Sequence, residues 1–167
     1  MRRSPLAACV AVIAMALPAA AAAALPTFAS NLVQPAEAIG GLALGKDAAF
    51  AEQRWGAADS CSEPPNAQCS YSAGPKGSAY YRVFDGQVEE IAVQAALDGR
   101  GDPIIRRPLK RLRTVKGIGI GSRLGEVRRA YPKGSSEGGS FFLRGPQGSF
   151  TLFLLDGTRV RGLLISR

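Results

Sequence analysis

The segment from Val115 to Gly121, V-K-G-I-G-I-G, places three glycines at alternate positions next to a lysine. Glycine-rich turns can bind phosphate, because bare backbone amides approach the anion at the point where a helix begins. A phosphate-binding enzyme is therefore one interpretation of this segment. The other is a purely structural turn between a short strand and the helix that follows.

Further catalytic chemistry has little support in the sequence. There is no histidine, which removes the most common general base at neutral pH and the most common metal ligand. The nearest acid-base pair is Glu89 and Glu90, and neighbours on a strand point to opposite faces, so they cannot flank one substrate. We therefore expect a protein that is not an enzyme and that holds no metal or cofactor.

Three cysteines are present, and Cys9 lies in a leader that we expect to be removed. Cys61 and Cys69 remain, separated by S-E-P-P-N-A-Q, a segment whose prolines and asparagine can turn the chain back. Two cysteines in an exported chain usually pair. We predict a Cys61–Cys69 disulfide rather than a closed zinc site, which needs four ligands.

The glycine-rich segment has a counterpart earlier in the chain. Residues 39–56 align with residues 115–132 at a constant offset of 76 positions, and Trp55 then matches Tyr131. The middle glycine of the later copy, Gly119, is Ala43 in the earlier one. A phosphate loop needs bare backbone at that position. The alignment therefore favours the structural turn.

The same alignment predicts the fold class. Each copy has a short strand (42–44 or 118–120), a glycine turn and an amphipathic helix, which begins at an N-cap Ser122 in the second copy and ends at Gly56 or Pro132. Two strands joined by Asp-Gly follow, with a slip in alternation that predicts a β-bulge. With an earlier strand near 69–73 or 140–144, each copy ends in a three-strand meander. We expect an α+β fold of two tandem repeats, with the helices packed on one face of the sheet.

The chain begins with two arginines, an apolar run over 6–17 and an alanine tract, the layout of a cleaved signal peptide. Cleavage is expected near Ala24, with Ala29 as the second choice; a lipoprotein box at L-A-A-C (6–9) fits less well. The expected organisation is a signal peptide (1–24), an N-terminal extension (25–38), repeat 1 (39–95), a basic linker (96–114) and repeat 2 (115–167). This predicts a periplasmic or secreted protein without a transmembrane anchor.

Charge is distributed unevenly along the chain. Residues 25–100 carry a net charge of −4 and residues 101–167 a net charge of +10. The densest basic run gives six candidate anion-binding residues: Arg106, Arg107, Lys110, Arg111, Arg113 and Lys116. No aromatic residue within it could stack on bases, so nucleic acid is not an expected partner. The alternatives are an anionic cell-surface polymer or a solvated linker.

Each copy contains G-[IL]-x-[IL]-G, a helix, an aromatic residue followed by Gly or Pro, and a meander in which Asp-Gly precedes V-x-x-I or V-x-x-L. This pattern resembles the repeat of β-lactamase-inhibitor-protein-like (BLIP-like) domains and is similar to small outer-membrane lipoproteins of the SmpA/OmlA type. The resemblance implies a helical layer on an antiparallel sheet, export, and binding to other proteins. A disulfide after the first helix also suits the inhibitor.

We therefore expect an exported binding module that binds an envelope or secreted protein through its sheet face. The candidate contact residues are the aromatic residues of the meanders: Tyr71, Tyr80, Phe84, Phe141, Phe142 and Phe150. The alternative function is an envelope-associated structural factor that holds anionic cell-surface polymer through residues 106–116.

Overall fold

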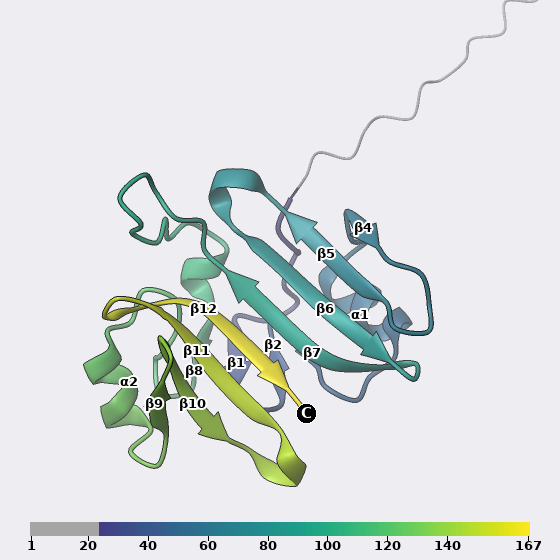
Figure 1. The fold of residues 1–167 in the computed structure, drawn as a ribbon. Helices are drawn as coiled ribbons and strands as arrows, with labels where there is room; N and C mark the ends of the chain where they lie inside the picture. The colour runs from purple at the N-terminus through teal and green to yellow at the C-terminus, as the bar shows by residue number, and fades with distance from the viewer. Residues whose placement is uncertain (1–23) are drawn as a thin grey trace, which may run out of the picture.

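The computed structural model describes residues 24–167, and its largest element is an antiparallel sheet of eight strands (Figure 1). The strands lie in the order β4 (Ser60–Cys61), β5 (Gln68–Ser72), β6 (Ser78–Phe84), β7 (Gln87–Gln94), β12 (Arg159–Ser166), β11 (Phe150–Asp156), β10 (Ser140–Arg144) and β9 (Ser135–Glu137). Two meanders, β5-β6-β7 and β10-β11-β12, meet where β7 pairs with β12. Both halves of the chain therefore contribute to one continuous sheet.

A second layer covers one face of this sheet. It contains α1 (Ala48–Trp55), α2 (Leu124–Ala130) and a small sheet in the order β3 (Leu42–Ala43), β2 (Ala38–Ile39), β1 (Leu32–Gln34), β8 (Arg113–Thr114). β1 pairs with β8 in parallel, which joins a strand near the start of the described chain to the segment just before α2. Three short 3-10 turns complete the elements: η1 (Gly74–Lys76), η2 (Leu109–Arg111) and η3 (Pro146–Gly148). Within residues 24–167, no helix has the length and apolar character needed to cross a membrane.

The core lies between the two layers and follows the alternation of the strands. In β6, Ala79, Tyr81 and Val83 are buried, while the residues between them face the other side of the sheet. Trp55 closes α1 onto this core and makes edge-to-face contacts with Tyr71 and Tyr81. In the second half of the chain, Phe153 packs edge to face against Phe141 and at a tilt against Tyr131. The same face of both meanders is thus buried.

The predicted α+β fold of two tandem repeats is wrong. The described chain is mostly β, with twelve strands in two sheets and two α-helices of eight and seven residues. The helices do not form the layer over the sheet by themselves, because the small sheet shares it and itself contacts β7. Its strands have only two or three residues, too few to give a periodic pattern in the sequence. Residues 118–120, expected as a strand, contribute only an isolated bridge between Gly119 and Arg113.

Several local predictions are confirmed. Both Asp-Gly pairs lie at hairpin turns: Asp85-Gly86 forms the first turn, whereas in the second Asp156 ends β11 and Gly157-Thr158 turns the chain. Both meanders shift register near the turn, between Arg82 and Val83 and between Leu154 and Leu155. The first helix ends at Gly56, whose φ of 81° suits glycine. The predicted N-cap at Ser122 is wrong. The second helix is capped at Arg123, and the Glu126 carboxylate accepts from the Arg123 amide at 2.7 Å.

The predicted disulfide between Cys61 and Cys69 is confirmed. The two cysteines are paired neighbours on β4 and β5, with their Cα atoms 4.0 Å apart. The bond therefore ties the short edge strand β4 to the body of the large sheet. Residues 1–23, which contain Cys9 and nearly all of the expected signal peptide, lie outside the described part of the chain.

Candidate functional site

The six candidate aromatic residues fall on both faces of the large sheet. Tyr71 and Phe141 belong to the core, with exposures of 2% and 1%. The prediction that they contact a partner is therefore wrong. The Tyr71 hydroxyl donates to the Gly56 carbonyl at 2.7 Å, and burial raises the Tyr71 pKa. The physical reason is alternation, which turns every second side chain of a strand towards the helical layer.

The opposite face of the sheet carries an ordered line of apolar side chains. The strand register places Tyr80, Ala92, Leu164, Leu152 and Phe142 side by side on five consecutive strands. We call these five residues the apolar row. All but Ala92 are half-buried, and none belongs to the hydrophobic core cluster. In Figure 1 α1 and the small sheet lie behind the large sheet, α2 lies beside its β9 end, and no helix crosses the face towards the viewer, which we call the open face.

Charged side chains flank the apolar row at both ends. Arg82 lies 3.5 Å from the Glu90 carboxylate and over the Tyr80 ring, and Arg144 lies over the Phe142 ring. The Tyr80 hydroxyl donates to Glu90 at 2.8 Å. Burial, followed by this hydrogen bond, raises the pKa of Tyr80 to about 12, so the hydroxyl stays protonated at neutral pH. The row therefore has an apolar centre and charged ends, of which the Tyr80 end is held by a hydrogen bond and an ion pair.

The two remaining candidates extend this surface. Phe150 lies next to Phe142, with ring centroids 5.4 Å apart. Phe84 is 59% exposed at the end of β6. It lines a hollow of about 750 Å³ together with Arg82 and Glu90. Four of the six predicted aromatic residues are therefore accessible from the open face or its edge.

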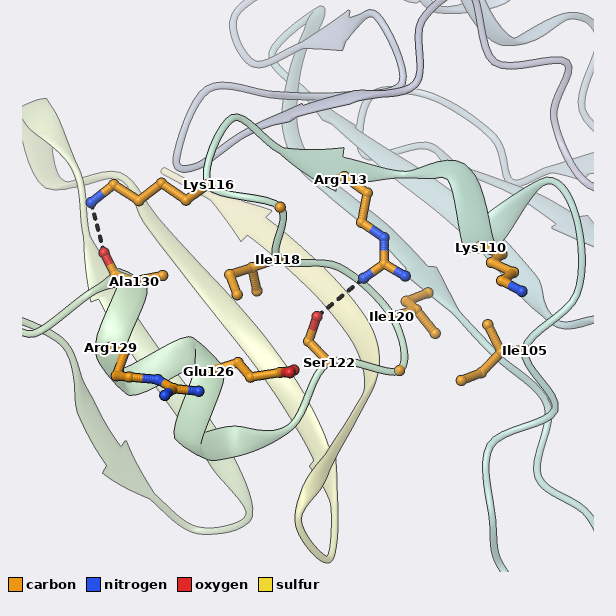
Figure 2. A pocket seen from close by; sticks show the side chains of 12 residues that line it. Ile105, Lys110, Arg113, Lys116, Ile118, Ile120, Ser122, Glu126, Arg129 and Ala130 are labelled. Atoms are coloured by element: carbon orange, nitrogen blue, oxygen red, sulfur yellow. Dashed lines mark hydrogen bonds between the residues drawn. The ribbon is translucent and has the colours of Figure 1, made fainter.

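A second candidate site lies in the other layer and is a pocket of about 830 Å³; Figure 2 shows the side chains that line it. Its cationic side chains are Lys110, Arg113 and Lys116 from the predicted basic run and Arg129 from α2. Glu126 is its one carboxylate, and that carboxylate already accepts from a backbone amide. Among residues 24–167, no carboxylate oxygen lies within 4.0 Å of these four cationic groups. We call this site the basic pocket.

The floor of the basic pocket is apolar, and two of its cations are held in place. Ile118 and Ile120 are buried beneath it. Arg113 donates to the Ser122 hydroxyl at 3.1 Å, as Figure 2 shows. The Lys116 ammonium donates to the Ala130 carbonyl at 2.6 Å and lies 4.9 Å from the centre of the Tyr131 ring. The pocket therefore combines oriented positive charge with an apolar base.

The structure divides the six predicted basic residues into two groups. Lys110, Arg113 and Lys116 line the pocket, whereas Arg106, Arg107 and Arg111 are exposed outside it. The segment is also more than a solvated connection, since Leu109 and Leu112 within it are fully buried. Arg129 was missed by the sequence analysis. Arg129 follows Glu126 by three residues on the exposed side of α2. This spacing is the one sequence signal that could have indicated that Arg129 lines the pocket.

The glycine-rich segment forms a wall of the basic pocket, but its amides are already bonded. Gly117 donates to the Thr114 carbonyl at 2.8 Å, Gly119 to the Ser122 hydroxyl at 3.1 Å and Gly121 to the Val160 carbonyl at 2.7 Å. A side chain on Gly119 would collide with the Leu112 carbonyl oxygen. Gly119 therefore allows close backbone packing, Gly117 and Gly121 supply the positive φ angles of 77° and 90°, and the three do not form a phosphate loop.

This role of Gly119 leads to a stability prediction. Gly119→Ala is expected to lower the free energy of unfolding by about 1–3 kcal/mol, the usual cost of overpacking. Gly125→Ala is the matched control, because a methyl group there enters open space on the exposed side of α2. It should raise the free energy of unfolding by about 0.5–1 kcal/mol through helix propensity. Urea denaturation measures both. Equal stability of the two variants would contradict the close-packing role.

The structure offers little support for acid-base or metal chemistry. Glu89 is bound by Arg167 at 2.7 Å, and Glu90 is bound by Tyr80 and Arg82. Within residues 24–167, no group of three His, Cys, Asp or Glu residues is placed to hold a metal ion.

Comparison with known proteins gives no family. No family model and no curated protein matches the sequence. Among solved structures, the chain is similar to an extracellular protein containing an SCP domain from Bacillus anthracis (TM-score 0.49, 12% identity), covering 74% of this chain and 43% of that one. It is also similar to a cysteine-rich secretory protein from Staphylococcus aureus (TM-score 0.46, 14% identity), covering 79% and 47%.

These comparisons overturn the resemblance suggested by the sequence. No family model matches the chain, and the two solved structures described above are an SCP-domain protein and a cysteine-rich secretory protein, not BLIP-like or SmpA/OmlA-type repeats. The motifs behind the resemblance were short glycine turns and Asp-Gly hairpins, which many unrelated β proteins share. The chain spans less than half the length of either solved structure. The similarity therefore assigns no activity or partner.

Proposed function

We propose that this chain is an exported, non-enzymatic binding module that binds an envelope or secreted protein through the open face of its eight-stranded sheet. The observation that carries the proposal is the apolar row, an ordered apolar surface on the face away from the helices. The row is partly exposed, and contiguous apolar surface that reaches solvent in this way marks protein interaction sites. Tyr and Arg, both present at the row, are enriched in interfaces.

Export is supported by two independent features. The first residues have the layout of a signal peptide, and the Cys61–Cys69 disulfide is of a kind that persists in oxidising compartments. We place the protein in the periplasm or outside the cell.

The charges favour a separate partner over a second copy of the chain. The residues after the expected signal peptide carry a net charge of +6, from −4 over residues 25–100 and +10 over residues 101–167, so like copies repel each other. Arg82 and Arg144 flank the row, and only Arg82 has a carboxylate neighbour within 4.0 Å among the described residues. The expected partner therefore presents apolar side chains in the middle of its contact surface and carboxylates at the edge.

Two leucines at the centre of the row provide the test. The double variant Leu152→Glu with Leu164→Glu places two carboxylates where the partner is expected to bury apolar surface. Cross-linking of the exported protein in cells, followed by mass spectrometry, should identify a partner. The recovered amount should fall at least tenfold in the variant, since buried unpaired charge weakens interfaces.

The matched control is Leu97→Glu, the same change at a leucine that is 42% exposed on a loop outside the row. It should leave the recovered partner unchanged. Thermal unfolding must show that all proteins are folded. Equal recovery by the double variant would refute the proposal, and dimers of the parent in light scattering would assign the face to a second copy instead.

A further inference from the structure

We infer that the basic pocket binds a phosphate-type anion carried on an organic body about the size of one ring. The site is separate from the open sheet face and lies in the layer of α2 and β8. Its cations, Lys110, Arg113, Lys116 and Arg129, come from segments on two sides of one hollow (Figure 2).

The charge of the pocket is uncompensated. Four cationic groups face one carboxylate, and the Glu126 carboxylate is engaged at the start of α2. Exposed like charges usually gain carboxylate neighbours or spread apart, because their repulsion is unfavourable. Here, within the described part of the chain, carboxylate neighbours are lacking, and the side chains surround one space. A bound anion would offset that repulsion.

Arg113 supplies a directed contact. A guanidinium has five N–H donors in a planar fork that matches the oxygens of phosphate. Among residues 24–167, the Arg113 guanidinium donates to the Ser122 hydroxyl alone. Its other donors are left for a ligand, and the bond to Ser122 fixes the plane of the group. Little side-chain freedom is then lost on binding.

The size and floor of the pocket define the rest of the ligand. Its volume of about 830 Å³ lies in the usual range of about 300–1,000 Å³ for small-molecule sites. A bare anion would leave most of this space filled with water. The isoleucine floor, Ile118 and Ile120, favours a ring with an apolar face. Because the amides of the glycine turn are already bonded, recognition rests on side chains.

The test uses phenyl phosphate as the probe, with inorganic phosphate and phenol as comparisons, in titration calorimetry at low ionic strength. Phenyl phosphate should bind more tightly than inorganic phosphate, and phenol should not bind. Added salt should weaken binding, as charge attraction requires. Methyl phenyl phosphate, a diester with one charge, separates the two sources of such a group. If methyl phenyl phosphate binds about as tightly as phenyl phosphate, the natural ligand is the diester of an anionic polymer. If it binds much more weakly, the natural ligand is a phosphorylated small molecule.

The deciding comparison removes the same number of charges at two places. Lys110→Gln with Arg129→Gln should weaken phenyl phosphate binding at least tenfold. Arg106→Gln with Arg107→Gln removes two charges of the same basic run outside the pocket. This variant should change the affinity for phenyl phosphate less than about twofold. All four side chains are exposed, so folding should be unaffected.

Equal weakening of phenyl phosphate binding by both double variants would overturn the proposal that the basic pocket binds this anion. Absence of phenyl phosphate binding by the parent would overturn it as well. The Leu152→Glu and Leu164→Glu variant should bind phenyl phosphate like the parent. Failure of the sheet-face proposal and failure of the pocket are therefore separate results.

Discussion

Replacing Trp55 with alanine is expected to lower the free energy of unfolding by about 3–5 kcal/mol, the range for a large aromatic side chain removed from a core. Trp55 is 1% exposed and contacts Phe28, Tyr71 and Tyr81 edge to face. Its indole N–H donates to the Ile39 carbonyl at 3.2 Å. The variant would leave a cavity between α1 and the large sheet, and would leave that carbonyl without its donor.

Denaturation with urea, followed by circular dichroism, measures this loss. Gln53→Ala is the control, because Gln53 is exposed on the same helix. It should change the free energy of unfolding by less than about 0.5 kcal/mol. A loss below about 1 kcal/mol for Trp55→Ala would mean that the indole does not fill the core.

Removing the disulfide by Cys61→Ser with Cys69→Ala is expected to cost about 2–3 kcal/mol of unfolding free energy. On the chain-entropy model, even a short closed loop restricts the unfolded chain by this amount. The structure adds a second reason, since the bond holds the two-residue strand β4 against β5. Alanine suits the buried Cys69, and serine suits the exposed Cys61.

Reduction provides the internal control for this prediction. A reductant should add two hydrogens, about 2 Da by mass spectrometry, to the parent alone. It should lower the stability of the parent to that of the double variant and leave the variant unchanged. Two free thiols in protein taken directly from the exporting cells, or equal stability before and after reduction, would contradict the assigned role.

The strands of the large sheet were largely predictable from the sequence, and the small sheet was not. β10 (Ser140–Arg144), both Asp-Gly hairpins and both bulges follow from alternation and turn residues, which act over short distances. β1 and β8 pair over some eighty residues with two or three residues each. Their position depends on tertiary contacts, and local patterns carry no information about those.

The candidate sites, like the sheets, were predictable from the sequence only where local patterns decide them. Phe141 and Phe142 are neighbours, so alternation requires them to face opposite sides. Which of them is buried depends on the side that the helices occupy, and the sequence does not specify this. The basic run identified three cations of the basic pocket, but Arg129 enters it from α2. Proximity of that kind comes from the packing of α2 against the turn.

The pairing of β7 with β12 has a consequence for how the protein folds. Paired residues of these strands lie between 68 and 76 positions apart in the sequence. Because closing so long a loop costs more entropy, β7 and β12 pair later than the hairpins on either side form. Until β12 is in place, β7 is an unpaired edge of a three-stranded meander, with free backbone donors and acceptors. A chain crossing a membrane from its N-terminus presents this edge before β12 emerges. The interval of translocation is therefore when the protein is most open to aggregation and most in need of a chaperone that covers strand edges.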